Sequence, residues 1–431
     1  MNALDRRSLA LSLALTALLA GAPAHAGDGT VPSFGLGTQT TQYVQSGSDA
    51  IRVDWPYGFS PILHLRTYYF ESDSLTGTET AAWALGGWAG ITTGFLGDVF
   101  QAGVVGYTSQ RIYGPADKDG TKLLLPGQDP INVLGEAFGA IRFADQTFIG
   151  YRQLVNRPFV NQYDSRMVPQ VFEGYTLRGA PAGVSYVAGY ITKIKIRDSD
   201  SYTWMNQAAG ASGPQQGMII GGVTIPFAQN GFVRVDEQYV KDAFNTYYVD
   251  GRYPIAFGDA TTLALAAQYY GQDAVGSKQL GDFSTWGLGA TGVLTLRELT
   301  VQLAYTQVGR GYDIQYPYGD SPSYANLMQI QFNGAGEKTW LAGASYDFAK
   351  LGAPGLSAGI IYAQGHSRID PSSGAPQPNR HETDVRADYL FPKGHVLEGL
   401  SATIRYAWQV QDGSPQTATQ LRAYLNYDVR F

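Results

Sequence analysis

The stretch LRAYLNYDVRF, residues 421–431, decides the fold, because apolar and polar side chains alternate through it. One face comprises Leu421, Ala423, Leu425, Tyr427, Val429 and Phe431. The other face comprises Arg422, Tyr424, Asn426, Asp428 and Arg430. Successive side chains of a β-strand point to opposite sides, so this period of two predicts a strand with one apolar and one polar surface. In the wall of a transmembrane barrel, such surfaces face lipid and lumen respectively.

The same alternation recurs along the chain and predicts further strands. It is found at 62–70, 136–143, 146–152, 184–197, 262–270, 299–306, 340–348, 356–362, 382–389 and 403–408. In 382–389, the polar face carries Glu382, Asp384, Arg386 and Asp388. A charge costs roughly 3 kcal/mol at the centre of a bilayer, so we expect this face to look into water. Between the strands lie segments rich in turn-forming residues, at 114–130, 199–217, 309–326 and 370–380.

The composition supports a membrane barrel over a soluble domain. Charged residues make up only 15% of the chain, whereas about 25% is usual in soluble domains. After the first 26 residues, no segment approaches the ~18 consecutive apolar residues that a membrane-spanning helix needs. The chain has no cysteine, which excludes disulfides and thiolate metal sites. The net charge of −6 argues against nucleic acid as a partner.

The ends of the chain predict export and assembly in the outer membrane. Residues 1–26 have the pattern of a secretory signal peptide: a basic pair at Arg6 and Arg7, an apolar run over 9–22, and small residues in Ala24-His25-Ala26. Residues 27–431 then form one barrel domain. Each hairpin takes about 45 residues, so this length accommodates roughly 18 strands. A strand ending on Phe431 resembles the terminal signal read by the barrel assembly machinery.

Motifs that could carry chemistry are incomplete. Gly287 to Gly292 has the glycine spacing of a dinucleotide site, but an alternating strand pattern follows where a helix is needed. His381-Glu382 lacks the second histidine of a zinc-protease helix, and Asp117 to Gly120 lacks the remaining ligands of a calcium loop. His366 adjoins Ser367, but neighbouring strand residues face opposite sides. We therefore expect no catalytic activity, metal or cofactor.

The stronger pattern is a set of cations on the predicted lumen faces of several strands. It comprises Arg66, Arg142, Arg152, Lys193, Lys195, Arg386, Arg405 and Arg422. Cations aligned in a narrow pore focus the electric field and concentrate anions. Arginine suits this role because its planar fork binds a carboxylate through two hydrogen bonds. The alternative is that lumen charges pair with one another, as Arg386 could with Asp384 or Asp388.

Several ordered motifs resemble the OprD family of outer-membrane porins. They are Leu65–Phe70, Asp164–Gln170 with Phe172–Gly174, Tyr190–Met205, Phe332–Trp340 and Gly352–Leu356. The resemblance covers most of the chain after the signal peptide. It implies an all-β, antiparallel barrel of 18 strands that is narrowed by inward-folded loops and lined by a ladder of basic residues. Members of the family pass small carboxylates or basic amino acids.

The resemblance also implies roles for particular residues. Arg386, Arg405 and Arg422 stand at ladder positions on the last strands, and Arg166 lies in the region of an inward constriction loop. Asp313 resembles an acidic residue on an inward loop that faces the ladder. Two departures suggest a thinner ladder: Thr403 stands where a second arginine is common, and residues 88–93 lack an expected basic residue.

These observations predict a passive, selective channel in the cell outer membrane for small anionic or zwitterionic solutes, most of all carboxylate-bearing nutrients. The expected surroundings are outer-membrane lipid and lipopolysaccharide. Two alternatives stay open: a channel for neutral or sugar-like solutes, and an outer-membrane hydrolase. The sequence also leaves open whether three barrels associate as a weak homotrimer.

Overall fold

The computed structural model describes residues 58–228, 230–258 and 260–429. The predicted signal peptide (residues 1–26) and Phe431 lie outside these ranges. No helix in the described part of the chain is long and apolar enough to cross a membrane. The helical pieces are short: η2 (Ala116–Lys118), η3 (Pro181–Gly183), α2 (Met205–Ala208) and η4 (Ala349–Leu351).

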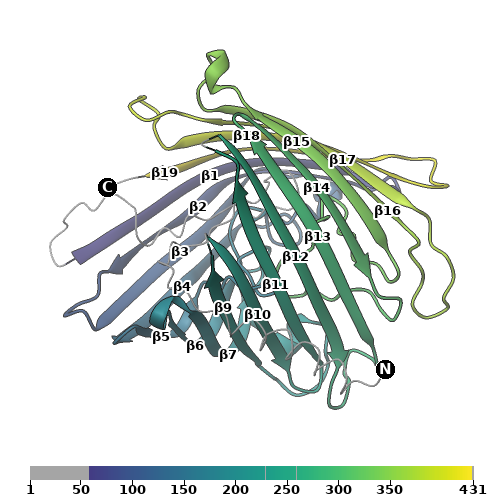
Figure 1. Cartoon of the computed structure of the whole chain (residues 1–431). Helices are drawn as coiled ribbons and strands as arrows, with labels where there is room; N and C mark the ends of the chain where they lie inside the picture. Colours follow the sequence, from purple (N-terminus) through teal and green to yellow (C-terminus); the bar gives the residue numbers. More distant parts are fainter. Residues whose placement is uncertain (1–57, 229, 259, 430–431) are drawn as a thin grey trace.

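Antiparallel strands make up the wall (Figure 1). They are β1 (Phe59–Asp73), β2 (Glu79–Thr93), β3 (Phe100–Tyr113), β4 (Ile131–Phe143), β5 (Gln146–Gln153), β6 (Val171–Gly179), β7 (Ser185–Lys195), β9 (Met218–Phe227), β10 (Gly231–Val240), β11 (Phe244–Ala256), β12 (Thr261–Ala274), β13 (Ser284–Leu296), β14 (Leu299–Val308), β15 (Lys338–Asp347), β16 (Leu356–His366), β17 (Arg380–Leu390), β18 (Leu400–Gln411) and β19 (Ala418–Val429). One more strand, β8 (Thr203–Trp204), lies in the loop after β7 and pairs with the end of β7.

The sheet closes on itself, because β1 pairs with both β2 and β19. Since β7 pairs directly with β9, the closed wall has 18 strands and β8 is an addition to it. The prediction of an 18-stranded antiparallel barrel is confirmed. Closure leaves no unpaired edge among the described wall strands, so their backbone groups bond one another where lipid could offer no partner.

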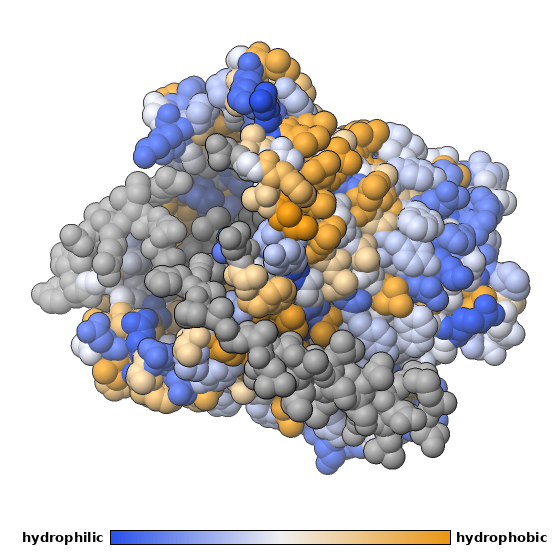
Figure 2. All heavy atoms as spheres, in the orientation of Figure 1, coloured by the Kyte–Doolittle hydropathy of each residue, from blue (hydrophilic) through white to orange (hydrophobic). Residues whose placement is uncertain are grey.

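The inside and outside of the wall follow from the alternation in the sequence. On β1, His64, Arg66 and Tyr68 are buried toward the lumen, whereas Leu65 is 45% exposed on the outer surface. Leu303 and Trp340 are also exposed on outward positions, at 61% and 62%. In Figure 2, hydrophobic side chains gather over the middle of the visible wall, and hydrophilic ones lie toward its ends. This distribution is the one that a lipid-facing band requires.

Long and short connections separate at the two ends of the barrel. One end carries the long loops 114–130, 154–170, 196–217 and 309–337, and the other carries tight turns such as 144–145 and 297–298. The long loops are packed against the inner wall through buried side chains. Leu123 and Met167 join one hydrophobic cluster with Tyr68 of β1, and Phe159 packs on Tyr270 of β12 at 5.2 Å between ring centroids. The core of the molecule therefore lies inside the barrel and positions the pore.

Candidate functional site

Two loops, 154–170 and 309–337, meet in the lumen and narrow it. The backbone N–H of Asn161 donates to the Tyr318 carbonyl at 3.2 Å, and the Asn161 side chain bonds both the carbonyl and the N–H of Asp320 at 2.9 Å. The Gln331 amide donates to the Tyr163 hydroxyl at 3.2 Å. The two loops thus form one continuous constriction, as the expectation of inward-folded loops requires.

Ion pairs and reciprocal hydrogen bonds fix these loops to distant parts of the wall. Arg157 forms a two-point contact with Asp236 of β10, at 2.6 and 2.8 Å. In the other loop, the N–H and carbonyl of Gln315 bond the Gln272 side chain of β12, each at 2.7 Å. Charge-assisted, two-point bonds define orientation as well as distance, so the constriction has a fixed place in the barrel.

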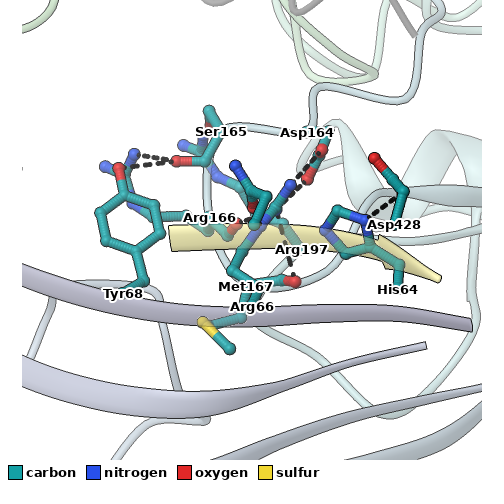
Figure 3. A network of polar contacts seen from close by, with 10 residues as sticks. His64, Arg66, Tyr68, Asp164, Ser165, Arg166, Met167, Arg197 and Asp428 are labelled. Atoms are coloured by element: carbon teal, nitrogen blue, oxygen red, sulfur yellow. Dashed lines mark hydrogen bonds and ion pairs between the residues drawn. The ribbon is translucent and has the colours of Figure 1, made fainter. Parts of the chain in front are cut away.

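Arg66, a predicted ladder cation, is used to hold the first loop. Its guanidinium donates to both carboxylate oxygens of Asp164 at 2.7 and 3.0 Å, and to the Arg166 carbonyl at 2.5 Å. Its Nε donates to Asn426 of β19 at 2.6 Å. Figure 3 shows Arg66 reaching from β1 into the loop residues around Asp164. The structure places Arg66 in the lumen, where its charge is matched by a loop carboxylate.

Arg166, the predicted constriction residue, lies in the same loop and is buried. Its Nε donates to the Thr121 carbonyl at 2.8 Å, and its guanidinium stacks on Phe70 at 4.6 Å from the ring centroid. Burial, together with the nearby charges of Arg197 and Arg422, lowers the pKa of the Arg166 guanidinium to about 9. Arg197 donates to the Ser165 hydroxyl and stacks on Tyr163 at 4.0 Å. Together Arg166 and Arg197 bring two positive charges to the first constriction loop.

Three arginines form a continuous row on the last three strands. Arg386 of β17 is the register partner of Arg405 of β18, and Arg405 is the register partner of Arg422 of β19. Directly opposite residues of neighbouring strands lie about 5 Å apart and face the same side. Arg405 and Arg422 are buried on the lumen side. The register therefore brings together the three residues that the sequence placed on separate strands.

The three members of this arginine row differ in their partners. Arg386 forms an ion pair with Asp388, whose second oxygen accepts from the Thr403 hydroxyl at 2.6 Å. Arg422 donates from Nε to the Gln420 side chain and from Nη2 to the Met328 carbonyl, each at 2.7 Å. By contrast, Nε and Nη1 of Arg405 are buried and have no hydrogen-bond partner among the described residues. Arg405 is therefore the row member that keeps buried donors without an acceptor in the described part of the chain.

Arg152 and Lys193 belong to a different row. Arg152 of β5, Glu173 of β6 and Lys193 of β7 are successive register partners, and Glu173 lies 3.5 Å from each cation. The register shifts beside Glu173, so that Thr192 has no opposite residue. Such a bulge changes which side chains share a face. The bulge therefore interrupts the continuous alternation that the sequence predicts over 184–197.

Lys195 and Arg142 lie apart from the arginine row. Lys195 is completely buried at the end of β7, where its ammonium donates to the Ile196 carbonyl at 3.0 Å. Arg142 is exposed near the end of β4 that leads into the 144–145 turn, and its guanidinium lies 3.5 Å from the Phe95 ring centroid. The structure thus divides the predicted ladder set into residues near the constriction and residues elsewhere on the wall.

Among acidic residues, Asp313 accepts a hydrogen bond from the Ala335 N–H at 2.6 Å and is exposed. A second acid in this loop, Asp320, escaped the sequence reasoning. It is buried where the two loops meet, and Gln331 donates to it at 2.8 Å. Burial raises the pKa of the Asp320 carboxyl to about 7, although Arg197 and Arg422 act in the opposite direction. Both acids lie in one turn-rich segment, and nothing in the sequence indicates which of them is buried between the two loops.

Glu382 and Asp384 also differ from expectation, since the sequence predicted that they look into water. They lie on the lumen side but are only 0% and 1% exposed. Glu382 accepts from the N–H groups of Gln329 and Ile330 at 2.7 and 2.6 Å, and Asp384 accepts from the Met328 N–H at 3.0 Å. The loop backbone has replaced water as the donor to both oxygens of Glu382 and to Oδ2 of Asp384, whereas Oδ1 of Asp384 is buried without a hydrogen-bond partner among the described residues.

The motifs judged incomplete in the sequence have structural roles or sit in loops. Gly287 to Gly292 lies within strand β13, and a Cβ at Gly287 would meet the Tyr270 ring at 2.2 Å. His381 and Glu382 are strand residues of β17. Within the described ranges, no cluster of three or more His, Asp or Glu side chains could hold a metal ion.

Comparisons with known proteins agree with this geometry. The family model described as outer membrane porin, OprD family, matches residues 58–431. Porin D of Pseudomonas aeruginosa is 28% identical over 383 residues, which cover 80% of this chain and 84% of that protein. Among solved structures, OccAB3 of Acinetobacter baumannii has a TM-score of 0.80 at 19% identity, covering 86% of this chain and 99% of its own. OpdK of Pseudomonas aeruginosa has a TM-score of 0.76 at 20% identity, with coverages of 86% and 98%.

Proposed function

The chain belongs to the OprD family of outer-membrane porins, and from that premise we propose that its solutes are small carboxylate-bearing nutrients guided by the arginine row. Its location is the outer membrane. In this proposal, solutes cross by passive diffusion through the loop constriction, and the row of Arg386, Arg405 and Arg422 selects for negative charge.

The observation that carries the proposal is the state of Arg405. Arg405 is 4% exposed, and its buried Nε and Nη1 have no acceptor in the described part of the protein. An unsatisfied buried donor costs about 1–3 kcal/mol, and more when it is charged. A passing carboxylate would supply the missing acceptor and recover part of that cost. The site would hold an anion only briefly, because a channel must release what it admits.

The partners of the neighbouring arginines support selection at one point in the row. Asp388 offsets the charge of Arg386, and Arg422 is occupied by Gln420 and the Met328 carbonyl. These arginines raise the local potential, while Arg405 offers the direct contact. One structural relative, OpdK, was solved with vanillate, an aromatic carboxylate. That protein shares the fold with this chain, and its ligand has the chemistry that Arg405 would bind.

The test is the permeability of Arg405→Gln, measured with purified protein in planar bilayers and proteoliposomes. Losing a charge-assisted contact costs about 1.5–3 kcal/mol before water compensates, so we expect carboxylate flux to fall severalfold. Flux of a neutral solute of the same size should stay unchanged, and Arg405→Lys should retain part of the anion preference. Raising the salt concentration should shrink the difference by screening.

Three outcomes would contradict the proposal. Equal losses for charged and neutral solutes would mean that Arg405 supports the shape of the wall. Unchanged carboxylate flux together with measurable sugar flux would favour a channel for neutral solutes, in which aromatic side chains provide the contacts. A reconstituted barrel without discrete conductance would remove the channel function and reopen the question of an outer-membrane hydrolase.

A further inference from the structure

The inner face of β17 above Arg386 is covered by a short piece of the loop 309–337. Three successive lumen-facing side chains of the strand hold this piece. Arg380 donates to the Gln331 carbonyl at 3.2 Å and forms a two-point ion pair with Glu337 at 2.7 and 2.8 Å. Glu382 and Asp384 then accept from three consecutive backbone N–H groups, those of Ile330, Gln329 and Met328, as described above.

The order of these contacts gives the path of the loop. As β17 runs from Arg380 to Asp384, the loop residues in contact run backward from Gln331 to Met328. The segment therefore lies antiparallel along the strand, held by side chains that are two residues apart. The next lumen-facing side chain is Arg386, which pairs with Asp388. The covering ends at the level where the arginine row begins.

Met328 closes the end of the segment over the neighbouring strands. Its N–H binds Asp384 of β17 at 3.0 Å, and its carbonyl accepts from Arg422 of β19 at 2.7 Å. The backbone of this one residue thus bridges from β17 to β19 across the intervening β18. The β18 residue opposite Asp384 is Ala407, a small side chain that is completely buried. The lumen-facing residue two positions before it is Arg405.

We propose that Glu382 and Asp384 are positioning residues that clamp segment 328–330 beside Arg405 and so set the width of the pore at the arginine row. The two side chains are suited to this because carboxyl oxygens accept N–H donors, two at Glu382 and one at Asp384. With the segment in place, Arg405 is only 4% exposed, so the position of the segment governs access to its guanidinium. The inference deepens the proposed function and rests on it for the identity of the solute, but not for the pore width.

The test uses Glu382→Gln, a substitution of nearly the same shape. Glutamine keeps one acceptor oxygen and turns an NH2 group toward a backbone N–H, so one of the two hydrogen bonds is replaced by a donor–donor contact. We expect the segment to leave the wall. In symmetrical potassium chloride, the single-channel conductance should rise roughly twofold, because the open cross-section at the constriction limits flow. The open-channel current should also fluctuate between levels.

A matched control is Glu136→Gln, which also removes one carboxylate from a wall strand. Glu136 of β4 accepts from the Tyr107 hydroxyl at 2.8 Å, a bond that the glutamine oxygen can keep. Its conductance should equal that of the unmodified protein. Glu382→Asp retains the carboxylate with a shorter reach, so its conductance should lie between those of Glu382→Gln and the unmodified protein. Heat-modifiable migration on gels verifies that each variant has folded.

The outcomes separate this inference from the proposed function. A folded Glu382→Gln barrel with unchanged conductance and unchanged current noise would overturn the clamp. Equal rises in Glu382→Gln and Glu136→Gln would also overturn it, because the cause would then be lumen charge. If Glu382→Gln widens the pore while Arg405→Gln leaves carboxylate flux intact, the clamp stands and carboxylate selection fails.

Discussion

Two rows of charged residues occupy the wall, each made of register partners on three adjacent strands. The first is Arg386, Arg405 and Arg422 on β17 to β19, and the second is Arg152, Glu173 and Lys193 on β5 to β7. The middle residue makes the difference. Glu173 lies between two cations and offsets them, whereas Arg405 adds a third positive charge and keeps unsatisfied donors. The same pairing in register thus gives a row whose central carboxylate offsets part of its positive charge in one region, and a row of three cations, which we propose attracts anions, in the other.

The largest expected effect comes from giving the first row the charge pattern of the second, which tests whether the central residue causes the difference between the rows. Arg405→Glu places a carboxylate between two arginines, as Glu173 lies between Arg152 and Lys193. The change removes an attractive contact and adds repulsion toward anions, together worth about 1.5–3 kcal/mol or more. We expect carboxylate permeability to fall by at least about tenfold, since ~1.4 kcal/mol corresponds to a factor of ten. Reversal potentials in a salt gradient should shift toward cation preference; a retained anion preference would show that the row does not select.

The converse change removes the neutralising residue from the second row. Glu173→Gln leaves Arg152 and Lys193 without their shared carboxylate, although Arg152 keeps its bond to the Leu134 carbonyl at 3.0 Å and its stacking on Tyr202. The three side chains are 17–30% exposed, so solvent screening limits the loss to about 1 kcal/mol of unfolding free energy. Urea titration of the refolded barrel in detergent measures it. Carboxylate flux should not change, and a drop as large as that of Arg405→Gln would place the second row on the solute path.

The smallest expected effect is a dependence of the anion preference on pH, which would arise from Asp320 near the first row. The pKa of Asp320 is raised to about 7 by burial, so its carboxyl becomes neutral as the pH falls through that value. Its negative charge then no longer offsets Arg197 and Arg422, and the constriction becomes more positive. Anion preference should be higher at pH 6 than at pH 8, by less than about twofold because Arg405 keeps its charge throughout. Asp320→Asn should remove this dependence; a variant that retains it would assign the titration to another group.

The strands could be predicted from sequence because their information is local. In 421–431, the polarity of each side chain indicates which side of the wall it faces. The outward Leu425 and inward Arg422 of the structure follow from this period of two. The same reasoning found Arg386, Arg405 and Arg422 as lumen cations. It could not show that they are direct neighbours, because register depends on pairs of strands rather than on one strand.

The loop contacts could not be predicted for a related reason. The bonds from Asp164 to Arg66, and from residues 328–330 to Glu382 and Asp384, join segments far apart in the sequence, and loops have no periodicity to read. As a result, Arg66 forms an ion pair with a loop carboxylate, and a loop backbone covers Glu382 and Asp384, which were expected to face water. The bulge at Thr192 could not be predicted from the sequence either. The extra residue changes which side the following residues face, but the residue types around it do not mark its position.

The pairing of β1 with β19 has a consequence for how the barrel is made. These strands stand at opposite ends of the described chain, yet they share a register from Leu63 opposite Val429 to Asp73 opposite Thr419. His64 bonds Asp428 at 2.7 Å and Arg66 bonds Asn426 at 2.6 Å across this seam. Contacts of such long sequence separation form slowly, because the intervening chain must first be ordered. We therefore expect the seam between β1 and β19 to close late in assembly, and both strand edges to need protection from mispairing until it does.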